Sequence, residues 1–140
     1  MSKDPMQLKS FFERYAVLSS GGPLPELADC YAESFIVAGP EGNAAFRNDD
    51  AFARWLEQVA VKNREYGLRV MEVVGINELP LNDLYTGAIV TWGAQFEKTG
   101  AEQIRFKITY FLSLLDDKPK IIMYISDQSQ EALMKSKGLL

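Results

Sequence analysis

The spacing of the apolar residues changes near Gly67, and this change limits the folds that the chain can adopt. Before Gly67, apolar side chains recur every three or four residues, as they do along one face of a helix. After it they alternate with polar side chains, which is typical of strands that have one buried face. Helices followed by consecutive long antiparallel strands are typical of α+β domains, so the sequence predicts that class.

Three helices are expected in the first half of the chain. The apolar spacing places them at residues 5–18, 25–32 and 48–64, and segments rich in glycine, proline or serine separate them. The second of these helices would carry Tyr31 on its apolar side. A short strand at residues 35–37 is expected between the second helix and the third.

Four strands are expected in the second half, at residues 68–76, 84–97, 103–115 and 120–126. A further helix is expected after Asp127, because residues 126–127 can cap one. In the strand at residues 103–115, one face is uniformly apolar and consists of Ile104, Phe106, Ile108, Tyr110 and Leu112. The other face is polar except for Phe111 and Leu115, which favours a homodimer contact there.

Length and charge exclude several classes of protein. The 140 residues contain no linker-like segment, so residues 1–140 are expected to form one domain. The net charge is −4 and no basic cluster is present, which argues against a nucleic-acid partner. The longest uncharged apolar-rich run, residues 84–96, is shorter than the ~20 residues that cross a bilayer. With no signal peptide at its start, the chain is expected to be soluble, cytoplasmic and free of membrane contact.

Histidine is absent from the sequence, and Cys30 is its only cysteine. Histidine is the most frequent general acid–base side chain near neutral pH and the most common metal ligand. An ordinary zinc site needs several cysteine or histidine ligands, and one cysteine forms no intramolecular disulfide. No segment has the spacing of a calcium- or magnesium-binding loop either. We therefore expect no metal site and no cofactor.

The first third of the chain resembles ketosteroid isomerase. The matching residues align with no insertion or deletion between them. They are Arg14-Tyr15, Tyr31-Ala32-Glu33, Val37, Pro40 and Gly42. On these matches and on its element order, the chain resembles the nuclear-transport-factor-2-like superfamily, which includes ketosteroid isomerases and SnoaL-like polyketide cyclases. The resemblance implies a cone-shaped fold, in which three N-terminal helices pack on a curved, mainly antiparallel sheet around a pocket.

The catalytic residues of these relatives are not reproduced here. The tyrosine that stabilises an oxyanion in the isomerases falls on Tyr15, but their proton-transferring aspartate falls on Gly39. Their later acid falls within residues 109–111, and none of these three is an acid. The paired histidines of other relatives fall near Met123 and Ile125. The resemblance therefore implies the fold without the isomerase mechanism or the histidine-dependent chemistries.

The residues expected to line the pocket are mostly aromatic. They are Tyr15, Tyr31, Trp55, Trp92, Tyr110 and Met123. For each of them, simple packing in the core is the alternative interpretation, because buried tyrosines and tryptophans are common in cores. The hydroxyl of Tyr15 is expected to find its partner in Tyr110, a water molecule or a ligand.

Two functions of different classes follow. The chain either binds a small, mostly apolar molecule, with any chemistry resting on tyrosine hydroxyls, or serves as a non-catalytic module for dimerisation or protein interaction. A ligand-sized cavity lined by Tyr15 and Tyr110 would favour the first function, and a filled cone would favour the second.

Overall fold

The computed structural model of the chain describes residues 5–116 and 118–127. Its helices are α1 (Pro5–Ser19), α2 (Leu24–Ala28), α3 (Asp50–Tyr66) and the short 3-10 helix η1 (Glu97–Thr99). Its strands are β1 (Tyr31–Gly39), β2 (Gly42–Arg47), β3 (Leu68–Pro80), β4 (Tyr85–Phe96), β5 (Gln103–Ser113) and β6 (Lys120–Ser126). The helix expected after Asp127 lies outside the described residues.

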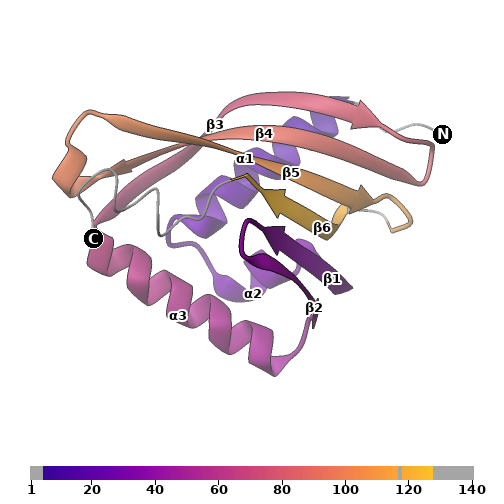
Figure 1. The fold of residues 1–140 in the computed structure, drawn as a ribbon, viewed down its shortest axis with the longest axis horizontal. Coiled ribbons are helices and arrows are strands. Elements are labelled where there is room, and N and C mark those ends of the chain that lie inside the picture. The colour runs from indigo at the N-terminus through magenta and orange to yellow at the C-terminus, as the bar shows by residue number, and fades with distance from the viewer. Residues whose placement is uncertain (1–4, 117, 128–140) are drawn as a thin grey trace.

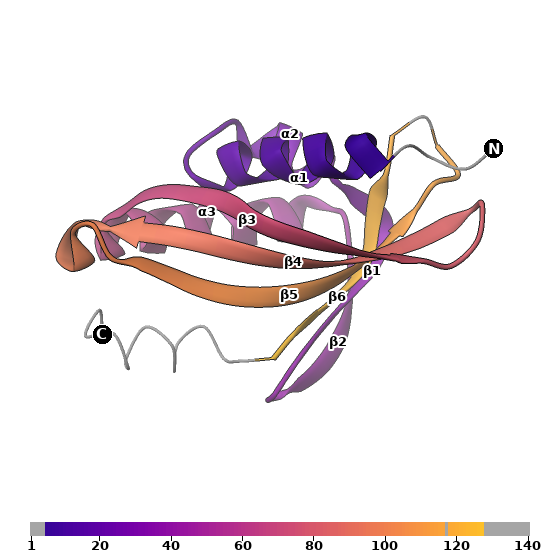
Figure 2. The ribbon, with the colours of Figure 1, turned by 90° about the horizontal axis from the view of Figure 1, so that it is seen from above.

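The strands form one curved, six-stranded sheet in the order β2-β1-β6-β5-β4-β3 (Figure 1). Neighbouring strands are antiparallel except β1 and β6, which are parallel. Figure 2 shows α1 and α2 along one side of the sheet, which we call the inner face; the opposite side is the outer face. The predicted α+β class and the mainly antiparallel sheet are confirmed. No helix among the described residues is both long enough and apolar enough to cross a membrane.

The core lies between α1 and the inner face of the sheet. Phe12 of α1 is fully buried, and its ring centroid lies 4.8 Å from that of Tyr110 and 6.2 Å from that of Trp92. The alternation predicted for the strand at residues 103–115 is confirmed, because Ile104, Ile108, Tyr110 and Leu112 are buried whereas Arg105 and Lys107 are exposed. This pattern fixes which side chains of β5 face the helices.

Helix α3 lies within two residues of the bounds predicted from the sequence, 48–64, at both of its ends. The side chain of Asp49 accepts a hydrogen bond from the backbone N–H of Phe52, which caps the first turn. Gly67 ends the helix with a φ of 78°, a left-handed conformation that favours glycine. Because Phe52 and Leu56 are buried, this helix lies with one apolar face toward the sheet.

The prediction for the second helix and the first strand is wrong in its boundaries. The helix ends at Ala28, and Tyr31 belongs to β1, which is longer than the three residues expected. The side-chain amide of Asn48 donates hydrogen bonds to the backbone oxygens of Ala28 and Tyr31, and thereby supports the extended backbone after the helix. Local helical spacing does not reveal this tertiary contact.

Strand β2 was not expected, and its presence means that α3 is not N-terminal to the sheet. The strand pairs with β1 through a hairpin whose Gly42 has a φ of 131°. Every residue of β2 is exposed, so its sequence carries no alternation of buried and exposed side chains. Two strands therefore precede the third helix, which corrects the expectation of three N-terminal helices.

Candidate functional site

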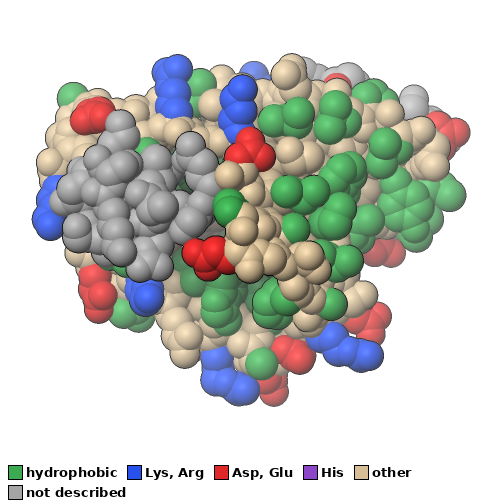
Figure 3. Space-filling view, in the orientation of Figure 1, with side chains coloured by type: hydrophobic (Ala, Val, Ile, Leu, Met, Phe, Trp, Pro, Cys, Tyr) green, Lys and Arg blue, Asp and Glu red, His purple; other side chains and the backbone are tan. Residues whose placement is uncertain are grey.

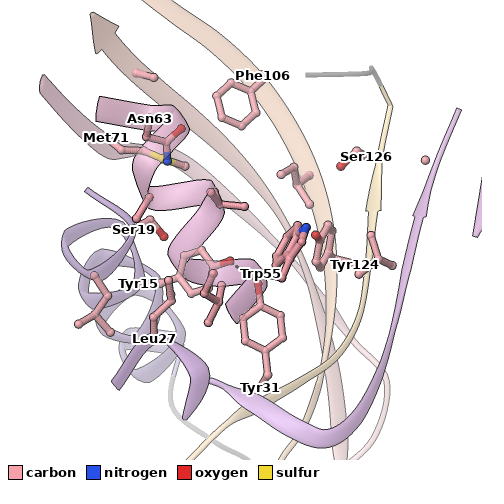
Figure 4. A pocket seen from close by; sticks show the side chains of 18 of the residues that line it. Tyr15, Ser19, Leu27, Tyr31, Trp55, Asn63, Met71, Phe106, Tyr124 and Ser126 are labelled. Atoms are coloured by element: carbon pink, nitrogen blue, oxygen red, sulfur yellow. Dashed lines mark hydrogen bonds between the residues drawn. The ribbon is translucent and has the colours of Figure 1, made fainter. Parts of the chain in front are cut away.

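A cavity of about 780 Å³ lies between the inner face of the sheet and the helices (Figure 4). Its walls come from α1, α2, α3 and all six strands, and most of the lining side chains are apolar. A volume of this size is within the range of small-molecule sites in proteins. The cone is therefore hollow, which was the condition for a ligand-binding function.

Four tyrosines from four different elements line the cavity. We call Tyr15 of α1, Tyr31 of β1, Tyr110 of β5 and Tyr124 of β6 the tyrosine cluster. The hydroxyls of Tyr15 and Tyr31 are hydrogen-bonded to each other at 2.5 Å. The ring centroids of Tyr110 and Tyr124 lie 5.9 Å apart. The phenol of Tyr15 thus has a partner that sequence reasoning did not name, because Tyr31 was placed on a helix.

Trp92 lies beneath the cluster and is not part of the cavity wall. Its side chain is fully buried, and its Nε1–H donates a hydrogen bond to the hydroxyl of Tyr110 at 3.0 Å. An indole only donates, so the oxygen of Tyr110 is the acceptor in this bond. Trp92 therefore positions the phenol of Tyr110, whereas the sequence predicted that it contacts the ligand itself.

Met123 lies on the outer face of the sheet. Tyr124 occupies the inner position that the sequence predicted for Met123. Ile121 pairs with Leu112, but Met123 already pairs with Phe111, so β6 has one extra residue at this point. Such a bulge reverses which side chains face inward from there on. Met123 is absent from the cavity lining and Tyr124 is present. A strand pattern that assumes regular alternation selects the wrong residue here.

Tyr124 has the most available hydroxyl of the cluster. Its side chain lines the cavity, and its hydroxyl has no hydrogen-bond partner among the described residues. No buried side-chain oxygen or nitrogen among the described residues lacks a partner, so the unpaired hydroxyl of Tyr124 is open to the cavity and not sealed in the core. Figure 4 shows Tyr124 across the cavity from Tyr15. The group is therefore suited to donate a hydrogen bond to a molecule in the cavity.

Trp55 forms part of the wall near the opening. Its side chain is 47% exposed, and its ring stacks on that of Phe52 with centroids 6.0 Å apart. Figure 4 shows it between Tyr15 and Tyr124. Of the side chains predicted from the sequence, the structure brings Tyr15, Tyr31, Trp55 and Tyr110 to one cavity, and it places Trp92 below it and Met123 on the far side of the sheet.

Burial raises the pKa of every phenol in the cluster above the ordinary value of 10. For Tyr124, burial raises the pKa to about 12. For Tyr15, Tyr31 and Tyr110, burial is the largest cause, and negative charge on a neighbouring phenol would raise the pKa further. The four phenols therefore stay protonated near neutral pH, where they donate hydrogen bonds and do not take up protons.

The described residues place no carboxylate or other evident proton acceptor in the inner part of the cavity. Among the described lining residues the only acid is Glu41, which lies exposed in the turn between β1 and β2. Gly39, where the sequence resemblance to ketosteroid isomerase leads us to expect an aspartate in those enzymes, also lines the cavity. No group of three potential metal ligands occurs among the described residues. The site offers hydrogen-bond donors and an apolar surface.

Solved structures match this fold, although no protein-family model and no curated protein matches the sequence. The β subunit of benzoate 1,2-dioxygenase from Burkholderia mallei matches with a TM-score of 0.69 and 12% identity over 95% of each chain. A nuclear-transport-factor-2-like protein with a cystatin-like fold from Novosphingobium aromaticivorans matches with a TM-score of 0.72 and 12% identity, over 98% of this chain and 88% of that one.

A third match is a nuclear-transport-factor-2-like protein of unknown function from Shewanella oneidensis. Its TM-score is 0.57 and its identity 15%, over 88% of this chain and 98% of the other. The chain therefore has the nuclear-transport-factor-2-like, or cystatin-like, fold, and the resemblance drawn from its sequence is confirmed at that level. Identities this low establish the fold alone.

Proposed function

We propose that this protein binds a small, mostly apolar molecule in its cavity and holds an oxygen atom of that molecule with tyrosine hydroxyls. The observation that carries the proposal is the unpartnered hydroxyl of Tyr124 in an apolar cavity that also contains the paired hydroxyls of Tyr15 and Tyr31. An oxygen that accepts a hydrogen bond from Tyr124 would satisfy this group. The apolar walls would bury the rest of the molecule.

Binding is favoured over proton transfer. General acid–base catalysis needs a group whose pKa lies near the working pH. The raised pKa values of the cluster place its phenols far from that range, and the lining acid, Glu41, lies at the rim. The hydroxyls can still polarise a carbonyl group, so any chemistry would have to rest on that polarisation.

Tyr124→Phe tests the proposal. As a probe we choose para-acetylbiphenyl, a flat apolar ketone with a single oxygen acceptor, and we measure its dissociation constant by titration calorimetry. Loss of one neutral hydrogen bond should raise the dissociation constant about 3- to 10-fold. The melting temperature should stay unchanged, because the hydroxyl of Tyr124 has no protein partner among the described residues.

Tyr85→Phe is the matched control, since it removes a phenol that does not line this cavity. It should leave the affinity for the ketone unchanged. If the wild-type protein binds the ketone and both variants bind it equally well, Tyr124 is not the group that holds the oxygen. If the wild-type protein does not bind it at all, the proposal of a cavity for apolar ketones fails.

A second candidate function, dimerisation, is favoured by the outer face of the sheet. Ile36, Met123 and Phe111 form one row across β1, β6 and β5, and Ile125 and Ile89 belong to the next row. We call these residues the outer apolar patch. Figure 3 shows apolar side chains gathered over the strands on this face. Exposed apolar patches of this kind mark interaction sites.

We expect a homodimer through the outer apolar patch. A specific interface would bury on the order of 1,200 Å² or more in total. Phe111→Lys places a charge in the middle of the patch and should convert the dimer to a monomer in light scattering at micromolar concentration. Val61→Lys, on the exposed face of α3, makes the same chemical change elsewhere and should leave the mass unchanged. A monomeric wild-type protein would contradict this prediction.

A further inference from the structure

Asn63 is a polar residue at an apolar position of α3. The side of this helix that faces the sheet contains Phe52, Leu56 and Val59, spaced by four and three residues, and Asn63 follows four residues later. This spacing continues the same helical face. Asn63, like Leu56 and Val59, lines the cavity. The sequence pattern predicts a leucine or valine there, and the chain has an amide.

The fold has no evident use for this amide. The side chain of Asn63 has no hydrogen-bond partner among the described residues, and Met71 and Phe106 are among the other lining residues near it in Figure 4. Asparagine is also a weaker helix former than leucine or alanine. Asn63 is half-buried, and no buried side-chain nitrogen or oxygen among the described residues lacks a partner, so its amide opens into the cavity and is available to a bound molecule.

Asn63 lies far from the tyrosine cluster. Figure 4 shows Asn63 and Tyr31 at opposite ends of the cavity, with Trp55 close to the tyrosines. Trp55 and Asn63 are separated by eight residues of one helix, which corresponds to about 12 Å along its axis. A single compact molecule such as one benzene ring cannot contact both ends. A molecule of two or more linked rings can.

We propose that the cavity takes an elongated, rigid and mostly apolar molecule with a neutral oxygen function at each end, and that Asn63 binds the oxygen opposite the tyrosines. This rests on the proposed function, since Tyr124 holds the first oxygen. The amide of Asn63 both donates and accepts hydrogen bonds, so it suits a hydroxyl. Glu41 and Arg64 both line the cavity, so their opposite charges give neither sign an advantage.

The test compares two probes that differ in one hydroxyl. The first is para-acetylbiphenyl, and the second is the same ketone with a hydroxyl at the para position of its far ring. The wild-type protein should bind the hydroxylated ketone about 5- to 10-fold more tightly. Asn63→Leu should remove this gain and leave the affinity for para-acetylbiphenyl within about twofold.

Two further variants complete the experiment. Asn63→Ala removes the amide without filling the cavity, and it should remove the gain in the same way. Gln58→Leu is the matched control, because it replaces an amide by leucine at an exposed position of the same helix that does not line the cavity, and it should keep the gain. Melting temperatures establish that all variants are folded.

The possible failures can be told apart. If para-acetylbiphenyl binds in a Tyr124-dependent manner but the hydroxyl adds no affinity, the inference about Asn63 is wrong and the proposed function stands. The same holds if the gain survives in both Asn63 variants. If neither ketone binds the wild-type protein, the proposed function fails and the inference fails with it.

Discussion

Above pH 10 this protein is expected to lose stability steeply. In the unfolded chain a phenol has a pKa near 10, whereas burial holds the pKa of the four cluster tyrosines above that value. Between these values the unfolded state releases protons that the folded state retains. A rise in pH therefore favours unfolding. The contribution of these groups is fully present below pH 10 and is lost as the pH rises toward the folded pKa, which for Tyr124 is about 12.

The expected effect is large. Each tyrosine that is ionised only in the unfolded state lowers the free energy of unfolding by about 1.4 kcal/mol per pH unit. Four such groups together give roughly 5 kcal/mol per unit, which is comparable with the whole stability of a small domain. Urea denaturation at pH 8, 10, 11 and 11.5 measures this slope.

Tyr124→Phe serves as the internal control for the alkaline transition. It removes one titrating group of four, so the slope above pH 10 should fall by about a quarter. Tyr85→Phe, which makes the same change of side chain outside the cavity, is the matched comparison. A free energy of unfolding that stays constant to pH 11.5 would contradict the assignment of the cluster as buried, protonated phenols.

The second large effect is expected at Gly39. This residue lines the cavity at the end of β1, and a Cβ atom added to it would come no closer than 3.9 Å to the backbone oxygen of Ser126. Its φ lies outside the left-handed region, so a side chain causes no backbone strain there. An aspartate at this position would therefore place a carboxylate at the edge of the cavity.

We expect no isomerisation of an unconjugated steroid ketone by the wild-type protein and measurable isomerisation by Gly39→Asp. A positioned general base typically contributes about 100- to 10,000-fold in rate. Gly39→Asn is the matched control, because it has the same size without the proton acceptor and should remain inactive. Spectrophotometric detection of the conjugated product measures the rate. Turnover by the wild-type protein at ordinary enzyme rates would show that another residue supplies the base.

The parts of the fold that could be predicted are those with a strong local pattern. In β5 the apolar and polar residues alternate over many positions, and one face of the strand is buried as expected. In α3, Asp49 and Gly67 mark both ends of the helix by chemistry that is local to the turn. Such signals survive in a single sequence because neighbouring residues alone produce them.

The parts that could not be predicted depend on contacts between distant residues. The edge strand β2 has no buried face, so its residues show no alternation. Tyr31 lies in a strand partly because Asn48, far along the chain, binds the backbone oxygen of Tyr31. Tyr124 lines the cavity in place of the predicted Met123, because β6 has one extra residue in its pairing with β5.

Asn63 was also missed, although its signal is present in the sequence. The spacing from Phe52 through Leu56 and Val59 reaches Asn63, so the residue can be recognised as a polar interruption of an apolar helix face. Such an interruption indicates a binding residue only if the helix face lines a cavity and not a filled core. Whether it does depends on how the helices lie over the sheet, which the spacing of residues in one helix does not show.

The most direct test of the proposed function is a crystal structure of the protein with para-acetylbiphenyl. We predict the two rings within the cavity, in contact with Trp55, and the ketone oxygen within hydrogen-bond distance of the Tyr124 hydroxyl. A ketone bound on the outer face of the sheet would contradict the proposal. So would a ketone in the cavity whose oxygen lies away from every hydroxyl of the tyrosine cluster.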